Sequence, residues 1–176
     1  MRLETERLVL RRWREEDLAP MAGVNADPEV MRWIGDGTTR DEETTRAGIE
    51  AAERSWEERG FGLFALEERA TGRMLGFAGL AVPLFLPEIL PAVEIGWRLD
   101  RAHWGRGLAT EAARAALAYG FGEAGLDRVV SVVQTGNRAS ERITEKLGMV
   151  LHRETVSPGP NRAVRVYALD RPRPRP

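Results

Sequence analysis

The chain has 176 residues, of which 43% are hydrophobic and 30% charged, an ordinary mixture for one globular domain. A domain of this length buries roughly 70% of the surface that its unfolded chain exposes, so it needs no disulfide or metal to stabilise it. The 26 basic and 27 acidic residues give a formal charge of −1, which argues against a protein that coats nucleic acid or an anionic membrane.

The absence of cysteine excludes disulfides, thiolate metal sites and a cysteine nucleophile. The two histidines, His103 and His152, are far apart in the sequence, so we expect no metal. The first residues are too charged for a secretory signal peptide, and no apolar run is long enough for a membrane helix. We therefore expect a soluble cytoplasmic protein that binds neither nucleic acid nor membrane.

Hydrophobic patterning predicts a mixed α/β fold in a single domain over residues 1–170, followed by a disordered Arg/Pro tail over 171–176. Strands are predicted at 8–13, 61–66, 74–82, 92–99, 128–135, 149–156 and 163–169. Helices are predicted at 15–24, in a short turn from Asp27, at 39–59 behind a capping box at Thr39, at 108–121 and at 137–147. Because 92–135 is a strand-helix-strand unit, we expect its two strands to be parallel with a right-handed crossover.

The segment 83–91 carries three prolines among apolar residues and so cannot be a central strand. We expect it to pack onto the body of the protein. An apolar loop of this kind is also consistent with a pocket floor or with contact to a second copy in a homodimer.

The most informative motif runs from Trp104 to Thr110, between a predicted strand and a predicted helix. Gly105 and Gly107 let the backbone turn sharply. The N–H groups of such a turn lie at the positive end of the helix dipole, which suits a pyrophosphate. An ordinary glycine turn has the same spacing, so the motif alone leaves both readings open.

Two other phosphate-binding motifs fit poorly. A Walker loop needs Gly-Lys-Ser/Thr, which is absent. A dinucleotide fingerprint needs a third glycine or alanine where Thr110 stands and an acidic residue after the next strand, whereas Asp127 precedes that strand. These two mismatches weaken the interpretation of the chain as a nucleotide-binding oxidoreductase.

The chain resembles the GNAT superfamily of N-acetyltransferases, and more closely its RimJ/RimL-like branch, which acts on ribosomal-protein N-termini. The resemblance covers nearly the whole chain and is strongest in VEIGWRLDRAHWGRGLATEAARAALAYGF and VVSVVQTGNRASERITEKLGM. The family's acyl-CoA loop fits Trp104-x-x-Gly107-x-Ala109, except that tryptophan replaces glutamine or arginine at the first position. The implied fold is a mostly antiparallel sheet with one parallel, splayed pair of strands, 92–99 and 128–135, and about four flanking helices.

The resemblance implies transfer of an acetyl group from acetyl-CoA to an amine in a ternary complex. The acceptor would be a protein N-terminus or a small-molecule amine. Backbone amides from Trp104 to Thr110 would hold the pyrophosphate, and the strand end at 97–99 would pair with the pantetheine arm. The Asn137 side chain would contact the same arm, or it would only cap the helix that it begins. The implied acetyl-CoA-binding residues are Trp97, Arg98, Leu99, Trp104, Gly105, Arg106, Gly107, Leu108, Ala109, Thr110 and Asn137.

Glu94 is the candidate general base, because burial in an apolar strand would raise its pKa into a useful range. A surface or structurally paired carboxylate is the competing reading. Strand alternation places Glu94 on one face with Gly96 and Arg98, although a bulge near Gly96, typical of the family, would change that face. His103 is a weaker candidate base, which we expect at the loop surface.

Ser140 matches the family position that supplies the acid for the leaving thiolate, although a serine in a first helical turn is also common. A backbone N–H between residues 96 and 99 is the expected oxyanion donor. We expect acceptor-pocket walls at residues 33–37 and 157–161, with Trp33 as a pocket aromatic and Trp56 in the core. A non-catalytic acyl-CoA sensor is the alternative to an enzyme, but a pure binder needs neither Glu94 nor Ser140.

Overall fold

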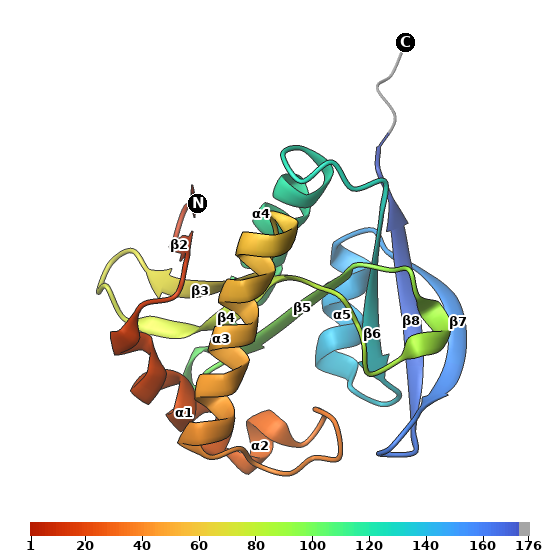
Figure 1. The fold of residues 1–176 in the computed structure, drawn as a ribbon, viewed down its shortest axis with the longest axis horizontal. Coiled ribbons are helices and arrows are strands. Elements are labelled where there is room, and N and C mark those ends of the chain that lie inside the picture. Colours follow the sequence, from red (N-terminus) through yellow and green to blue (C-terminus); the bar gives the residue numbers. More distant parts are fainter. Residues whose placement is uncertain (173–176) are drawn as a thin grey trace.

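One eight-stranded sheet with helices on both faces forms the framework of the computed structural model, which describes residues 1–172 (Figure 1). Its strands are β1 (Arg2–Glu4), β2 (Leu8–Arg11), β3 (Leu63–Glu68), β4 (Met74–Ala81), β5 (Glu94–Leu99), β6 (Arg128–Gln134), β7 (Val150–Ser157) and β8 (Arg162–Asp170). The strand order is β1-β2-β3-β4-β5-β6-β8-β7, and the β5–β6 pair alone is parallel. The predicted mixed fold with one parallel pair is confirmed.

Within residues 1–172 five helices flank the sheet, and the short turn predicted from Asp27 is one of them, so there is one helix more than the family resemblance implies. They are α1 (Leu18–Ala26), α2 (Pro28–Met31), α3 (Glu42–Arg59), α4 (Leu108–Phe121) and α5 (Arg138–Lys146). Short 3₁₀ turns cover Glu15–Asp17, Pro87–Ile89 and Arg101–His103. No helix within residues 1–172 is both long and apolar enough to cross a membrane.

The capping box predicted at Thr39 is wrong by two residues. The α3 helix begins at Glu42, and the Asp41 side chain caps it by accepting a hydrogen bond from the Thr44 N–H at 2.8 Å. An aspartate is a strong N-cap in its own right, because its carboxylate binds the unpaired N–H groups of the first turn.

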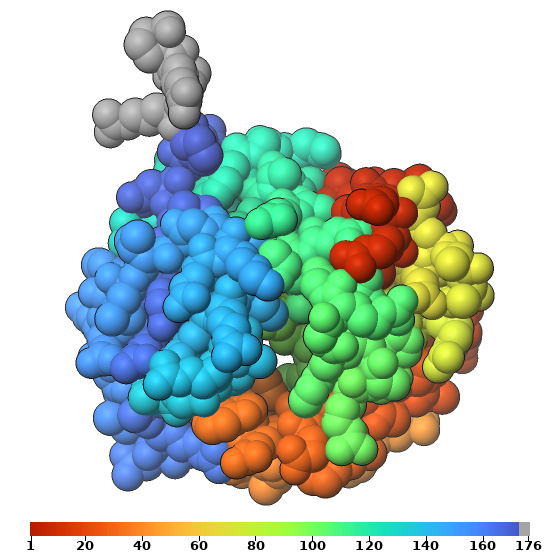
Figure 2. Space-filling view, turned by 180° about the vertical axis from the view of Figure 1, so that it is seen from behind, coloured from red at the N-terminus to blue at the C-terminus, as the bar shows by residue number. Residues whose placement is uncertain are grey.

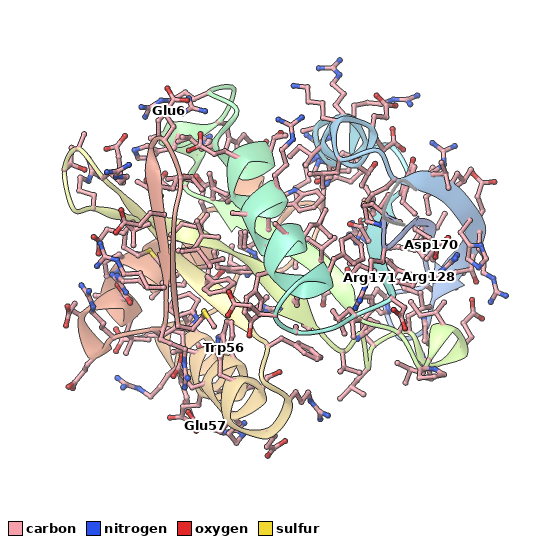
Figure 3. The ribbon with its side chains drawn as sticks, turned by 90° about the horizontal axis from the view of Figure 1, so that it is seen from above. Glu6, Trp56, Glu57, Arg128, Asp170 and Arg171 are labelled. Carbon is pink, nitrogen blue, oxygen red and sulfur yellow. The ribbon has the colours of Figure 1, made fainter. Side chains whose placement is uncertain are left out.

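The core lies between the sheet and α4, whose small side chains allow a close approach. Ala112, Ala113 and Ala116 are fully buried there. At the end of α3, Trp56 packs edge-on against Phe64 with ring centroids 4.6 Å apart, and it is labelled in Figure 3. Only 6% of Trp56 is exposed, so its predicted place in the core is confirmed.

The segment between β4 and β5 packs onto the body through Leu86, which is fully buried, while Leu84 and Phe85 stay exposed. At the chain end, the N–H of Arg171 donates to the carbonyl of Asp127 at 2.8 Å. The rest of the predicted tail, 173–176, lies outside the described residues.

The two halves of the sheet meet only loosely. β6 pairs with β8 along its whole length, and Arg128 forms an ion pair with Asp170 across these strands at 2.8 Å (Figure 3). In contrast, β5 and β6 share a single bridge, between Glu94 and Val130. The predicted splay is thus present, and it leaves a gap in the middle of the sheet.

Candidate active site

The gap begins at one side chain. The N–H of Val130 donates to the carbonyl of Val93 at 2.9 Å, as in a parallel ladder. A continued ladder would next join the N–H of Val132 to the carbonyl of Ile95. Instead, the Val132 N–H donates to Glu94 Oε1 at 3.2 Å. The Glu94 carboxylate therefore takes over a backbone hydrogen bond at the point where the strands part.

Beyond this point, the β5 backbone faces the gap without a partner strand. Peptide groups alternate in direction along a strand, so the N–H and C=O groups of Trp97 and Leu99 point toward β6, as those of Val93 do. The indole Nε1 of Trp104 donates to the Leu99 carbonyl at 2.9 Å. The remaining groups are a short unpaired edge that an extended molecule can join.

The gap opens into a cavity of about 360 Å³. Figure 2 shows the opening as a hole between α5, drawn in light blue, the green stretch of chain that follows β5, and the orange stretch around α2. The predicted residues Trp33, Glu94, Trp97, Arg98, Asn137 and Ser140 all line this cavity, with parts of the 157–160 loop. Its charged residues are Arg40, Glu94 and Arg98.

Burial raises the pKa of Glu94 to about 7, and the hydrogen bond from Val132 opposes that rise. The bulge near Gly96 that the family resemblance raises is absent from the β4–β5 pair, because the two strands pair in unbroken register from Glu94 to Leu99. Simple alternation therefore puts Glu94, Gly96 and Arg98 on one face. The surface reading of Glu94 does not hold, because the side chain is half-buried and lines the cavity.

Asn137 and Ser140 lie across the gap, at the start of α5. Asn137 Oδ1 accepts a hydrogen bond from the Ser140 N–H at 3.2 Å, so Asn137 caps the helix and also lines the cavity. The Ser140 hydroxyl is half-buried and makes no hydrogen bond within residues 1–172. It is therefore available to a bound molecule.

The loop from Gly105 to Thr110 presents a row of N–H groups that have no acceptor within the described part of the chain. Gly105 and Gly107 adopt φ angles of 74° and 78°, a left-handed conformation that glycine adopts at little cost. The Trp104 N–H, in contrast, donates to the Arg101 carbonyl at 3.1 Å, so its expected contribution to an anion site is wrong. The free donors stand at the positive end of α4, where an anion binds favourably.

Residues 7–150, which contain this loop, the gap and Glu94, match the family model of the acetyltransferase (GNAT) domain. The chain belongs to the GNAT family of acetyltransferases. Over 149 residues it is 37% identical to the Bacillus subtilis protein YkkB, with 84% of each chain covered. Over 175 residues it is 29% identical to the uncharacterized N-acetyltransferase YoaA of Bacillus subtilis, with 97% of each covered.

Solved structures share the architecture. An acetyltransferase from Agrobacterium tumefaciens superimposes with a TM-score of 0.82 at 29% identity, covering 96% of this chain and 94% of that one. RimL, a ribosomal-protein N-terminal acetyltransferase in complex with coenzyme A, superimposes with a TM-score of 0.78 at 18% identity, covering 97% and 98%. The predicted GNAT fold and N-acetyltransferase activity are confirmed.

The surface of this GNAT protein beside the loop carries both basic and acidic side chains. Arg7 donates to the Arg106 carbonyl at 2.8 Å and to the Glu111 carboxylate at 2.7 Å, which ties the N-terminal strands to the start of α4. Arg7, Arg114 and Lys146 line a hollow of about 790 Å³ next to Gly107. Glu6 and Glu111 line the same hollow, and Glu111 forms an ion pair with Arg7, so Arg114 and Lys146 are the cations there that remain for an anion.

The expectation that His103 lies at the loop surface is wrong. Only 7% of its surface is exposed, because its 3₁₀ turn, capped by the Asp100 side chain, folds back onto the protein. His103 is not among the residues that line the cavity of this acetyltransferase. It is therefore not placed to act as the base.

Two residues that sequence reasoning missed fix a wall of the cavity. Gln134 Nε2 donates to the Gly35 carbonyl at 2.7 Å, and Arg162 Nη1 donates to Gln134 Oε1 at 3.0 Å. They hold the predicted 33–37 wall against β6 and β8. No local sequence pattern predicts these contacts, because the residues that form them are far apart in the sequence.

Proposed function

We propose that this N-acetyltransferase moves the acetyl group of acetyl-CoA directly to a primary amine, with both substrates bound at once. The gap between β5 and β6 carries the proposal, since it joins a donor-lined loop at one end to the half-buried carboxylate of Glu94 at the other. A non-catalytic acyl-CoA sensor needs the loop and the gap, but it gives no reason for Glu94 and Ser140 to meet in one cavity.

The free N–H groups from Gly105 to Thr110 would bind the pyrophosphate of acetyl-CoA. Several free N–H groups at the positive end of the α4 dipole suit two linked phosphates. The nearby cations Arg114 and Lys146 also attract the negative charge of the phosphates. The fit is supported by RimL, which shares the fold and is described as bound to coenzyme A. Because the contacts are made by the backbone, tryptophan at position 104 does not disturb them.

The pantetheine arm would lie in the gap as an additional strand. The amide groups of the arm would pair with the unpaired backbone of Trp97 and Leu99, and the Asn137 side chain would contact the arm from the other side. This places the thioester near Glu94, where the strands converge. The N–H of Trp97 points into the gap and is the proposed donor to the oxyanion.

The amine must lose a proton before it attacks, and Glu94 would accept that proton directly or through a water molecule. A base with a pKa of about 7 is ionised in about half of the molecules at neutral pH and still binds a proton well. The leaving thiolate needs a proton in return, and the Ser140 hydroxyl across the gap would supply it. The acceptor would be a protein N-terminus, as for the RimJ/RimL branch, or a small-molecule amine.

The test is steady-state turnover of purified protein with acetyl-CoA and a panel of amines, followed with a thiol reagent. Because the chain has no cysteine, any thiol that appears comes from CoA. We expect release of free CoA that depends on the amine. Saturable CoA binding with no release across the panel would instead establish the sensor.

A further inference from the structure

Arg98 is a buried cation on the wall of the cavity. Only 9% of the residue is exposed. Its Nη1 donates to Asn25 Oδ1 at 2.6 Å, while its Nε has no hydrogen-bond partner within the described residues. The group that holds the guanidinium is thus a neutral amide, and part of its donor capacity is unused.

Arg98 also lacks a counter-ion. The other buried arginine, Arg11, is matched by Asp17 at 2.7 Å, whereas Arg98 takes part in no ion pair among residues 1–172. The charge that acts on its pKa is another cation, Arg40, which also lines the cavity. Burial, and then repulsion from Arg40, lower the pKa of Arg98 to about 9. A buried charge without a partner is costly, so its presence indicates an anion that arrives with a ligand.

The guanidinium is held in place for such a ligand. It lies over the Phe77 ring at 5.2 Å, and its partner Asn25 is itself fixed by a hydrogen bond to Thr45 Oγ1 at 2.9 Å. These contacts orient the planar fork without neutralising it. A planar fork of this kind matches a carboxylate, which it can bind through two parallel hydrogen bonds.

The position of Arg98 separates it from the reacting centre. Glu94 and Arg98 lie four residues apart on the same face of β5, so their Cα atoms are roughly 13 Å apart at about 3.3 Å per residue. The wall between and around them is apolar, with Trp33, Phe77 and Phe85 among its residues. A molecule that reaches both charges therefore needs an apolar spacer.

We propose that the acceptor is an amine with a carboxylate several bonds away, which Arg98 binds with help from Arg40 while the amine lies at Glu94. This inference rests on the proposed acetyl transfer, whose acceptor class it names. It also accounts for the two cations at one end of a cavity whose single acidic residue is at the other.

The first test compares three six-carbon amines that differ only at the far end: 6-aminohexanoate, hexylamine and 1,6-diaminohexane. We expect kcat/KM to be highest for 6-aminohexanoate, by about tenfold or more over hexylamine, and lowest for the diamine. In Arg98→Met the ratio between the first two should fall close to one. The exposed Arg54 of α3 provides the control, since Arg54→Met should keep the wild-type ratio.

A second arm measures anion binding without turnover, as the shift of Tm caused by hexanoate against hexan-1-ol. Hexanoate should raise the Tm of the wild type and of Arg54→Met but not that of Arg98→Met.

If no amine is acetylated while hexanoate still stabilises the protein through Arg98, acetyl transfer is wrong and the anion site stands. Equal kcat/KM for the three amines in the wild type overturns the inference and leaves acetyl transfer intact. A loss of CoA affinity in Arg98→Met also overturns it, because the side chain would then serve the acetyl donor.

Discussion

The backbone N–H of Val132 donates to the Glu94 carboxylate at 3.2 Å, in the position where a parallel ladder would continue to the Ile95 carbonyl. One side chain thus ends the pairing of β5 with β6 and faces the gap that results. Its half-buried position also raises its pKa to about 7. The same residue is therefore linked to both the shape and the proposed chemistry of the cavity.

Replacing this carboxylate should change the pH dependence of the reaction. In the wild type, we expect kcat/KM to rise with pH through about 7 as Glu94 loses its proton. Glu94→Gln keeps an acceptor for the Val132 N–H but cannot take a proton, so kcat/KM should fall about 100-fold or more and lose that limb. Glu88→Gln, on the half-exposed 83–91 segment, is the control. A Glu94→Gln profile that coincides with the wild type would eliminate Glu94 as the base.

The same substitution should affect stability in a pH-dependent way. Because the folded state raises the pKa of Glu94, its stabilising contribution is complete below the unfolded value of 4.5 and is lost as pH rises through about 7. Glu94→Gln removes this loss, so its free energy of unfolding should exceed that of the wild type above about pH 7, by at most about 3 kcal/mol. Urea unfolding at about pH 5 and about pH 8 measures the effect. A difference that does not grow with pH would contradict it.

Gly107→Val should abolish measurable CoA binding. Gly107 adopts a φ of 78°, which a β-branched residue adopts only with strain, so the following N–H groups would be displaced. A Cβ at this position meets Arg7 Nη2 at an ordinary 3.6 Å, so the effect comes from the backbone and from the approach of the ligand rather than from crowding.

The matched control is Gly72→Val in the β3–β4 turn, where φ is 71° and the space is open. It carries similar strain away from the loop and should bind CoA normally in a calorimetric titration. Equal affinities for CoA in the two folded variants would show that the loop does not hold the pyrophosphate.

Ser140→Ala should reduce kcat by about 100-fold and leave the affinity for CoA unchanged. Since the hydroxyl has no partner within the described chain, the free energy of unfolding should change by less than about 0.5 kcal/mol. Asn137→Ala provides a contrast, because loss of the helix cap should lower the free energy of unfolding by about 1 kcal/mol. Steady-state kinetics together with urea unfolding separates the two variants. Undiminished kcat in Ser140→Ala would remove its role as the acid.

Features with a local signal could be predicted from the sequence. Two glycines before an alanine-rich helix gave the donor loop, and a lone glutamate in an apolar strand gave the candidate base. An asparagine three residues before a serine gave the α5 cap. In each case the relevant physics acts within one turn or one strand, so the residue pattern is sufficient.

Features that depend on distant partners could not be predicted. Asn25 and Arg98 are 73 residues apart in the chain, and nothing near either indicates their contact. The Trp104 N–H, which the motif predicts to be free, donates within its own turn, and the same turn buries His103, which the sequence predicts at the surface. Periodicity reports which face of an element is apolar, but not which polar group on another element will meet it.

Binding of acetyl-CoA along the loop and the gap is tested most directly by backbone amide NMR during a titration with CoA. We predict that the largest shift changes fall on the N–H groups from Gly105 to Thr110 and on those of Trp97 and Leu99. In the free protein, the Trp97 and Leu99 amides should exchange with solvent faster than those of Gly96 and Arg98, which face β4. Shift changes confined to other parts of the protein, or equally slow exchange along all of β5, would contradict this placement.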